Sequence, residues 1–254
     1  MSIWETLRAS AGDGNAKVGT SIAKAKVYQG SSISGEIYVI GGETEQEIKG
    51  AYIFVMTNVL VEEGGRKALE EVEIQKLKIS GAFTIGPREE KTIPFAFELS
   101  RETPMTVHKV DVWLKTMLEV RGKNNLREEH DIHVFGTEAA EKILYAVQEM
   151  DFPLKKVVNV QSRRTNSGVL QEFEFYPNKK FKRRFSELEL VLISDQAGTT
   201  AYIQLDKEER QTKDLLAREL NGKETILTLH YPSSNVPGVD AIARQLHDLL
   251  LGKT

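Results

Sequence analysis

The sequence predicts a mainly β fold, and three observations lead to this prediction. Residues 27–61 contain two long segments of alternating apolar and polar residues, separated by a polar turn that glycines mark. Shorter alternating segments recur roughly every 8 to 15 residues up to position 135, a spacing typical of an antiparallel β-sandwich. Helical periodicity is strongest over 137–150 and near the C-terminus. We therefore expect two β-rich domains, a connecting helix and a C-terminal helix.

Chain length and the position of the first strong helix set the expected domain boundaries. A chain of 254 residues accommodates two domains of the common size, roughly 100 to 150 residues each. We expect an N-terminal β-sandwich over 1–136, a connecting helix over 137–152 and a C-terminal β-rich domain over 153–254. Thr137 can cap the connecting helix, and Pro153 ends it because proline cannot continue the helical hydrogen bonds.

The first domain is expected to contain about seven strands. Ile33, Ile37 and Val39 share one parity of the first long segment, which indicates a strand with one buried face. The second long segment, 48–61, is partly apolar on both faces, as an interior strand is. Pro94 lies on the opposite parity from the apolar residues of 91–99, which favours an edge strand because proline has no N–H to donate.

The second domain is expected to be β-rich, with two helices in its second half. Candidate strands lie around 156–160, 173–175, 188–192, 201–205 and 226–231. A weaker helical pattern covers 208–220, and a strong amphipathic helix ends the chain. The apolar stripe of the last helix contains Val239, Ile242, Ala243, Leu246, Leu249 and Leu250. Either its own domain covers this stripe or a second copy of the chain does, which would give a homodimer.

The composition excludes several classes of protein. With 40% apolar and 28% charged residues, the chain can form a packed core, and global disorder is not expected. It has no cysteine, which excludes disulfides and thiolate metal sites and fits a reducing compartment. The N-terminal residues do not resemble a secretion signal, and no run of about 18 apolar residues occurs. We therefore expect a cytoplasmic protein without a transmembrane segment.

A search for catalytic or metal-binding patterns favours a non-enzymatic role. The sequence has no GxSxG nucleophile motif, no Walker-type phosphate loop and no GxGxxG after a strand. His130 and His133 are three residues apart on an expected strand and so point to opposite faces, whereas the ligands of one metal must converge. We expect no catalytic residue, no cofactor and no metal ion.

One segment has a strongly unbalanced charge. Residues 155–184 contain nine basic and two acidic residues, a local net charge of +7 in a chain whose net charge is −3. Six consecutive residues at an expected hairpin turn form the candidate partner-binding site: Lys179, Lys180, Phe181, Lys182, Arg183 and Arg184. The turn is either simply solvated or attracts an anionic partner. An acidic protein is favoured over nucleic acid, because no aromatic stacking platform or readout helix accompanies the cluster.

Several segments resemble known families. Three segments of the first half resemble the N-terminal lobe of arrestin-like proteins: 27–37 (VYQGSSISGEI), 48–53 (IKGAYI) and 92–99 (TIPFAFEL) followed by Pro104. The second half adds 173–177 (FEFYP), 187–192 (ELELVL) and 205–207 (LDK). With these segments in this order, the whole chain is similar to the bacterial sporulation-control protein family, the M type of the stage-zero sporulation group.

The resemblance implies two arrestin-like lobes in a non-enzymatic cytoplasmic regulator. Such a protein would affect sporulation, cell division or cell shape through contacts with other proteins, cytoskeletal ones included. Arrestins also hold a buried charged cluster that acts as a latch. Asp111, on an otherwise apolar strand, is the candidate for such a latch here, although an outward-facing Asp111 is the simpler interpretation.

Three functional hypotheses follow from the residues and the resemblance together. The first is a scaffold that binds protein partners through a sheet edge of the first domain and the basic turn of the second. The second is a β-sandwich module that binds lipid headgroups or acidic polymers through the same turn. The third is a self-assembling protein that pairs through its last helix.

Overall fold

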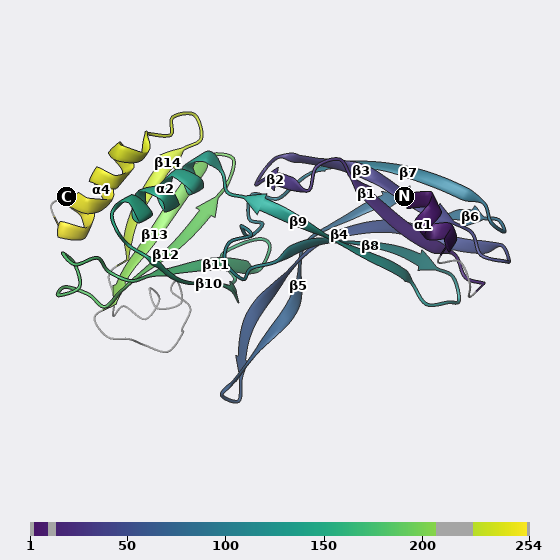
Figure 1. Cartoon of the computed structure of the whole chain (residues 1–254), viewed down its shortest axis with the longest axis horizontal. Helices are drawn as coiled ribbons and strands as arrows, with labels where there is room; N and C mark the ends of the chain where they lie inside the picture. Colours follow the sequence, from purple (N-terminus) through teal and green to yellow (C-terminus); the bar gives the residue numbers. More distant parts are fainter. Residues whose placement is uncertain (1–2, 10–13, 207–225, 253–254) are drawn as a thin grey trace. The chain divides into compact units, whose positions relative to one another are not determined.

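The computed structural model in Figure 1 describes residues 3–9, 14–206 and 226–252. Its secondary structure is dominated by antiparallel strands, so the predicted mainly β class is confirmed. The chain divides into two compact units, which are described separately below. The first unit comprises Met1–Thr57, Glu71–Ser100 and Asp111–His133, and the second comprises Asn58–Glu70, Arg101–Val110 and Val134–Thr254.

The first unit is a sandwich of two antiparallel sheets. One sheet has the strand order β1-β3-β7, and the other has the order β2-β9-β8-β4-β5, with β6 paired to β4. The elements are α1 (Ile3–Ala9), β1 (Lys17–Ile22), β2 (Lys26–Tyr28), β3 (Ser32–Ile40), β4 (Gln46–Glu63), β5 (Arg66–Ser80), β6 (Phe83–Ile85), β7 (Glu90–Glu98), β8 (Val112–Val120) and β9 (Leu126–Phe135). The end of β4 and the start of β5, within 58–70, and the last two residues of β9 belong to the second unit. Nine strands are thus present among the described residues where about seven were expected, and two of them, β2 and β6, are only three residues long.

The core of the first unit lies between its two sheets. Ile37 and Val39 of β3 are fully buried, as their parity predicts, and so are Ile53 and Val55 of β4. A hydrogen bond of 2.7 Å between the hydroxyl groups of Thr20 (β1) and Thr116 (β8) joins the two layers. The side chains that the alternation assigned to the buried face therefore do fill the sandwich.

The turn after β3 carries the chain from one sheet to the other. The two long segments of 27–61 are strands, as predicted, but β3 pairs with β1 and β7 whereas β4 pairs with β8, β5 and β6. Gly41 lies so close to the backbone of Gly86 that a Cβ atom would clash with its carbonyl oxygen. Pro94 lies in β7, at the edge of the three-stranded sheet, which confirms its predicted edge position.

The second unit contains one five-stranded antiparallel sheet and two helices that pack on it. Its elements are α2 (Glu138–Glu149), β10 (Leu154–Gln161), β11 (Val169–Phe175), β12 (Glu187–Ser194), β13 (Gly198–Asp206), β14 (Leu227–Pro232) and α4 (Val239–Leu251). The strands follow in the order β10-β11-β12-β13-β14, so each one pairs with its neighbour in sequence. All five predicted strands are confirmed. The weaker helix expected over 208–220 lies outside the described residues.

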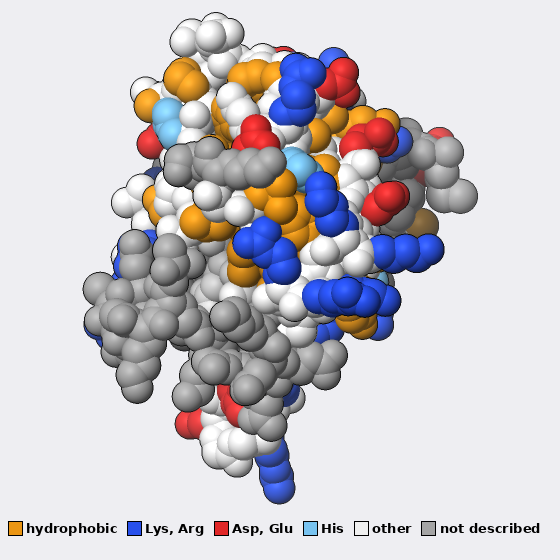
Figure 2. Space-filling view, turned by 90° about the vertical axis from the view of Figure 1, so that its left-hand side faces the viewer, with side chains coloured by type: hydrophobic (Ala, Val, Ile, Leu, Met, Phe, Trp, Pro, Cys, Tyr) orange, Lys and Arg blue, Asp and Glu red, His pale blue; other side chains and the backbone are white. Residues whose placement is uncertain are grey.

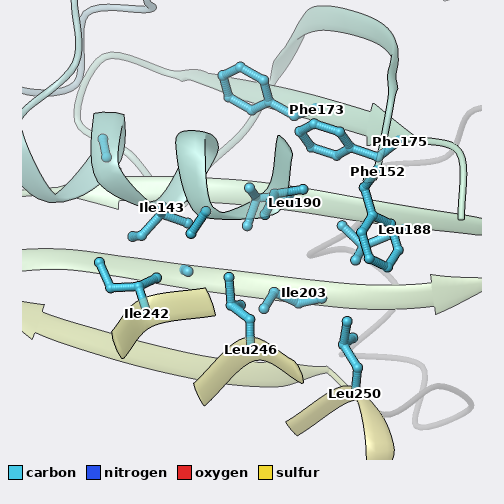
Figure 3. Packing of buried hydrophobic residues seen from close by; sticks show 14 of the residues in the cluster. Ile143, Phe152, Phe173, Phe175, Leu188, Leu190, Ile203, Ile242, Leu246 and Leu250 are labelled. Atoms are coloured by element: carbon cyan, nitrogen blue, oxygen red, sulfur yellow. The ribbon is translucent and has the colours of Figure 1, made fainter. Parts of the chain in front are cut away.

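The two helices cover one face of this sheet. Figure 3 shows Ile143 of α2 and Ile242, Leu246 and Leu250 of α4 turned toward side chains of the sheet such as Leu190. The three α4 residues are at most 3% exposed, and burying such side chains stabilises a fold by roughly 1.5 to 3 kcal/mol each. The apolar stripe of the last helix is therefore covered by its own unit, the first of the two alternatives.

The N-terminus of α2 is fixed as its sequence predicts. The Thr137 hydroxyl accepts a hydrogen bond from the Ala140 N–H at 3.3 Å, which confirms the predicted cap. The same hydroxyl bonds to those of Thr199 at 2.8 Å and Ser194 at 3.3 Å. These bonds hold the start of α2 on the sheet. The expected connecting helix is thus packed within the second unit.

Candidate functional site

The candidate site is the turn between β11 and β12, and residues 179–184 are called the basic turn below. Phe175 of β11 pairs with Leu188 of β12, so the two strands form a hairpin that the basic turn closes. The predicted hairpin position is therefore confirmed. Lys179, Lys180, Lys182, Arg183 and Arg184 are all exposed.

A short helical turn gives the basic turn its conformation. The side-chain Oδ1 of Asn178 accepts hydrogen bonds from the N–H groups of Lys180 at 2.9 Å and Phe181 at 3.1 Å. Its Nδ2 donates to the carbonyl oxygen of Met150 at 2.7 Å. The Phe185 N–H donates to the Phe181 carbonyl at 3.2 Å, which closes one i to i+4 turn. Asn178 therefore caps this turn and ties it to the chain just after α2.

Two phenylalanines anchor the basic turn in the core. Phe181 and Phe185 are 0% and 4% exposed, and their ring centroids are 5.6 Å apart. Both pack on Phe152, at centroid distances of 5.7 Å and 6.2 Å. The assignment of Phe181 to the partner-binding surface was therefore wrong. Its side chain is an anchor that faces the core, and only the cations around it are open to a partner.

The exposed cations of the basic turn are not neutralised by the part of the chain that the structure describes. No carboxylate within the described ranges forms an ion pair with them. Lys180 is the most constrained of the five, because its Nζ lies 2.6 Å from Nε2 of His247 on α4. In this contact the ammonium donates and the imidazole nitrogen accepts, so the His247 proton belongs on Nδ1. His247 also packs edge-on against the Phe181 ring, with centroids 5.8 Å apart.

Two other lysines of the basic segment are paired with buried carboxylates. Lys155 Nζ lies 2.9 Å from Glu187, and Lys156 Nζ lies 3.2 Å from Glu174. Burial raises the pKa of Glu187, and the nearby Glu174 carboxylate raises it further, whereas Lys155 lowers it. These pairs were not predicted from the sequence, although both glutamates lie on the strand face opposite to the buried Phe and Leu residues. These two lysines therefore contribute less than the basic turn does to the binding of an anionic partner.

Figure 2 shows the face of the molecule that carries α4. Lys and Arg side chains (blue) lie there beside hydrophobic side chains (orange). Tyr176, which follows β11 directly, is 48% exposed, and Lys155 Nζ lies 5.6 Å from the centre of its ring. Exposed aromatic side chains such as Tyr176 are enriched at protein interfaces.

The other predicted features of a site are placed less favourably. Asp111 is exposed, and it is its backbone carbonyl that accepts the Thr57 hydroxyl hydrogen bond at 2.8 Å. It is therefore not part of a buried charged latch. In the described ranges no three His, Cys, Asp or Glu side chains are grouped so as to hold a metal ion. No described helix has both the length and the hydropathy needed to cross a membrane.

The fold and the site define a two-unit, mainly β protein with a preformed basic surface. Comparison with known proteins identifies its family. Residues 5–209 match the model of the SpoOM protein family, so the chain belongs to the Spo0M family. The resemblance to the sporulation-control protein family is thereby confirmed.

Two relatives span nearly the whole chain. The sporulation-control protein spo0M of Bacillus subtilis (strain 168) is 28% identical over an alignment of 253 residues that covers 98% of each chain. The crystal structure of Spo0M, sporulation control protein, from Bacillus subtilis superposes with a TM-score of 0.87 at 27% identity. That match covers 95% of this chain and all of the other. The similarity therefore includes both units.

Proposed function

We propose that this protein is a non-enzymatic cytoplasmic regulator in the control of sporulation, which acts by binding an acidic segment of a partner protein. The family membership and the name of the Bacillus subtilis relative support the sporulation role. The observation that carries the binding role is the basic turn, with five exposed cations on a backbone that buried Phe181 and Phe185 hold in place.

A rigid basic turn suits a protein partner for two physical reasons. Exposed cations attract an acidic surface over several ångströms and so increase the rate of encounter. Because Asn178 and the two phenylalanines fix the backbone, the turn loses little conformational freedom when it binds. Tyr176 then offers an apolar contact that can be desolvated at the centre of an interface. A partner in cell division, in cell-shape control or in the cytoskeleton fits this proposal if it presents an acidic segment.

The sheet edges of the first unit are the second element of the proposed scaffold. β1 and β7 end the three-stranded sheet, and β2 and β5 end the other sheet path. An edge strand can accept an extended segment of a partner as an additional strand. The basic turn would attract the partner, and an edge would give sequence-independent backbone pairing.

Affinity capture from a lysate of the native bacterium tests the proposal. The wild-type chain is compared with a variant in which four cations of the basic turn are replaced by glutamate: Lys180, Lys182, Arg183 and Arg184. The matched control reverses four exposed cations that lie outside the basic turn and the edge strands, and so changes the net charge equally: Lys24, Arg88, Lys109 and Arg163. We expect an acidic protein to be captured by the wild type and the control and to be lost from the turn variant.

The outcomes separate this proposal from its alternative. If all three baits capture the same proteins, the basic turn is not the binding surface and the sheet edges become the candidates. If the turn variant instead loses sedimentation with anionic liposomes, with steep salt dependence, the turn binds lipid headgroups. Each variant is first shown to unfold at the wild-type temperature, so that lost capture is not lost folding.

A further inference from the structure

Lys180 differs from the other lysines of the basic turn because an imidazole contacts its amine. Its Nζ lies 2.6 Å from Nε2 of His247, a separation at which a base can take a proton from a nucleophile. Within the described ranges, the side chains of Lys179 and Lys182 have no such neighbour. A lysine attacks an acyl group as the neutral amine, so a proton acceptor in this position assists the attack by Lys180.

Buried side chains hold both partners of this contact in place. The Nζ of Lys180 lies 5.9 Å from the centre of the fully buried Phe181 ring. The His247 ring packs edge-on against the same ring, with centroids 5.8 Å apart. On either side of His247, buried Leu246 and Leu250 fix α4 on the sheet. The amine and the imidazole are therefore positioned before any reagent binds.

The imidazole is arranged to receive a proton. Oδ1 of Asp248 lies 3.8 Å from Nδ1 of His247, the ring nitrogen that does not face Lys180. A carboxylate on this side stabilises the imidazolium that forms once Nε2 has taken a proton. The His247 side chain is 35% exposed, so the proton can pass on to water. Carboxylate, imidazole and nucleophile thus follow in the order that activates nucleophiles in many proteins.

The other cations of the basic turn indicate which acyl donor would react. Four exposed cations are neighbours of Lys180 along the turn: Lys179, Lys182, Arg183 and Arg184. Lysine and arginine form strong, charge-assisted hydrogen bonds to phosphate oxygens, and a group of them attracts anions. An acyl phosphate carries its reactive carbonyl carbon directly on a phosphate group. Binding of that phosphate by the turn would bring the carbonyl carbon close to Lys180.

We propose that Lys180 is an acylation site that reacts with acyl phosphates. The ammonium group passes one proton to Nε2 of His247, and the neutral Nζ forms a bond to the carbonyl carbon. The bond from this carbon to the phosphate oxygen then breaks, and a second proton of the nitrogen leaves with the phosphate. The products are an amide at Lys180, hydrogen phosphate and an imidazolium that returns its proton to water.

Acylation would change the charge of the basic turn. The amide of Lys180 carries no charge, so the turn loses one of its cations and should bind an acidic partner more weakly. This consequence rests on the proposed function. The chemical step needs no partner and is tested on the chain alone, so its failure would leave the proposed partner binding untouched.

Acetylation kinetics resolved for each lysine of the full chain test the site. The chain is incubated with acetyl phosphate near neutral pH, and mass spectrometry measures the rate at every lysine. We expect Lys180 to react about tenfold or more faster than Lys182, which is exposed on the same turn without an imidazole. His247→Gln keeps a polar side chain but removes the base, so it should lower the rate at Lys180 to about that of Lys182.

A neutral acyl donor separates the role of the base from that of the cations. With p-nitrophenyl acetate, which has no phosphate, His247→Gln should again slow the reaction of Lys180. R183Q/R184Q should slow acetylation by acetyl phosphate about threefold or more at low salt. With p-nitrophenyl acetate the same variant should stay within about twofold of wild type. The thermal unfolding of both variants is measured to show that they remain folded.

Three results would overturn the proposal. The first is equal acetylation rates at Lys180 and Lys182 in the wild type. The second is an unchanged rate at Lys180 in folded His247→Gln, which would leave the imidazole without a role. The third is equal slowing of both acyl donors by R183Q/R184Q, which would mean that the cations do not bind the phosphate.

Discussion

The basic turn and the pocket of the first unit, which lies where β1 and β4 begin, β8 ends and β9 begins, contain similar side chains on differently built backbones. In the basic turn, five cations surround one helical turn that Phe181 and Phe185 anchor, so they point outward into solvent. In the pocket, the starts and ends of four strands bring Lys17, Lys49, Lys123 and Arg127 around one hollow. The first arrangement displays its cations around a convex turn, whereas the second places them around a concave surface. Similar side chains are thus presented differently by the two backbones.

The largest expected effect comes from removing the anchor of the basic turn. Phe181 is fully buried and contacts the rings of Phe152 and Phe185. Phe181→Ala should lower the free energy of unfolding by about 3 to 5 kcal/mol, because it leaves a cavity among aromatic rings. Urea unfolding measures this change. A loss below about 1 kcal/mol would show that the turn does not depend on this anchor.

The next largest effect is expected at the wall of the pocket. Gln46 is 5% exposed, and its side chain satisfies the buried N–H of Ala16. Gln46→Ala should lower the free energy of unfolding by about 1 to 3 kcal/mol, because it leaves that N–H without its acceptor. Urea unfolding measures this change as well. Unchanged stability would contradict the assigned role of Gln46.

Reversing charge on the basic turn should separate binding from stability. K182E/R183E changes two exposed side chains, so the free energy of unfolding should stay within about 0.5 kcal/mol of wild type. The association rate with the captured acidic partner should fall about tenfold at low salt and much less at high salt. Stopped-flow or surface-based kinetics at two ionic strengths measure this. An equal fall at both salt concentrations would argue against electrostatic steering.

The smallest effect is expected at the buried carboxylate beside the turn. Burial raises the pKa of Glu187, so the folded protein binds its proton more tightly than the unfolded chain does. Ionised Glu187 therefore opposes folding, and this destabilisation disappears as pH falls through the raised pKa. The free energy of unfolding of wild type relative to Glu187→Gln should thus decrease as pH rises from acid to neutral. The opposite slope would mean that the Lys155 contact outweighs burial.

Short-range sequence patterns predicted most elements of the second unit and the position of the basic turn. Strands β10 to β14, helices α2 and α4 and the Thr137 cap all follow from short-range periodicity and capping, which neighbouring residues determine. The hairpin position of the basic turn was predictable for the same reason. The burial of Phe181 was missed, although Asn178 followed by Phe181 and Phe185 at i and i+4 is the spacing of a capped helical turn.

Non-local pairing explains what the sequence did not reveal. β3 and β4 are consecutive in sequence but belong to different sheets. β3 pairs with β7 and β4 pairs with β8, and both partner strands lie far along the chain, so the change of sheet has no local signal. The pocket likewise combines Lys17, Lys49 and Arg127, which are distant in sequence and meet only through strand pairing. The function of a surface built in this way can be inferred only once the topology is known.

The most direct test of the central claim is a lysine-reactivity footprint of the full chain with its captured acidic partner. The rate of amine acetylation is measured by mass spectrometry with and without the partner. We expect protection of Lys179, Lys180 and Lys182 on the basic turn and unchanged reactivity of Lys123 in the pocket. Protection of Lys123 or of lysines on the sheet edges, with the basic turn still fully reactive, would contradict the account.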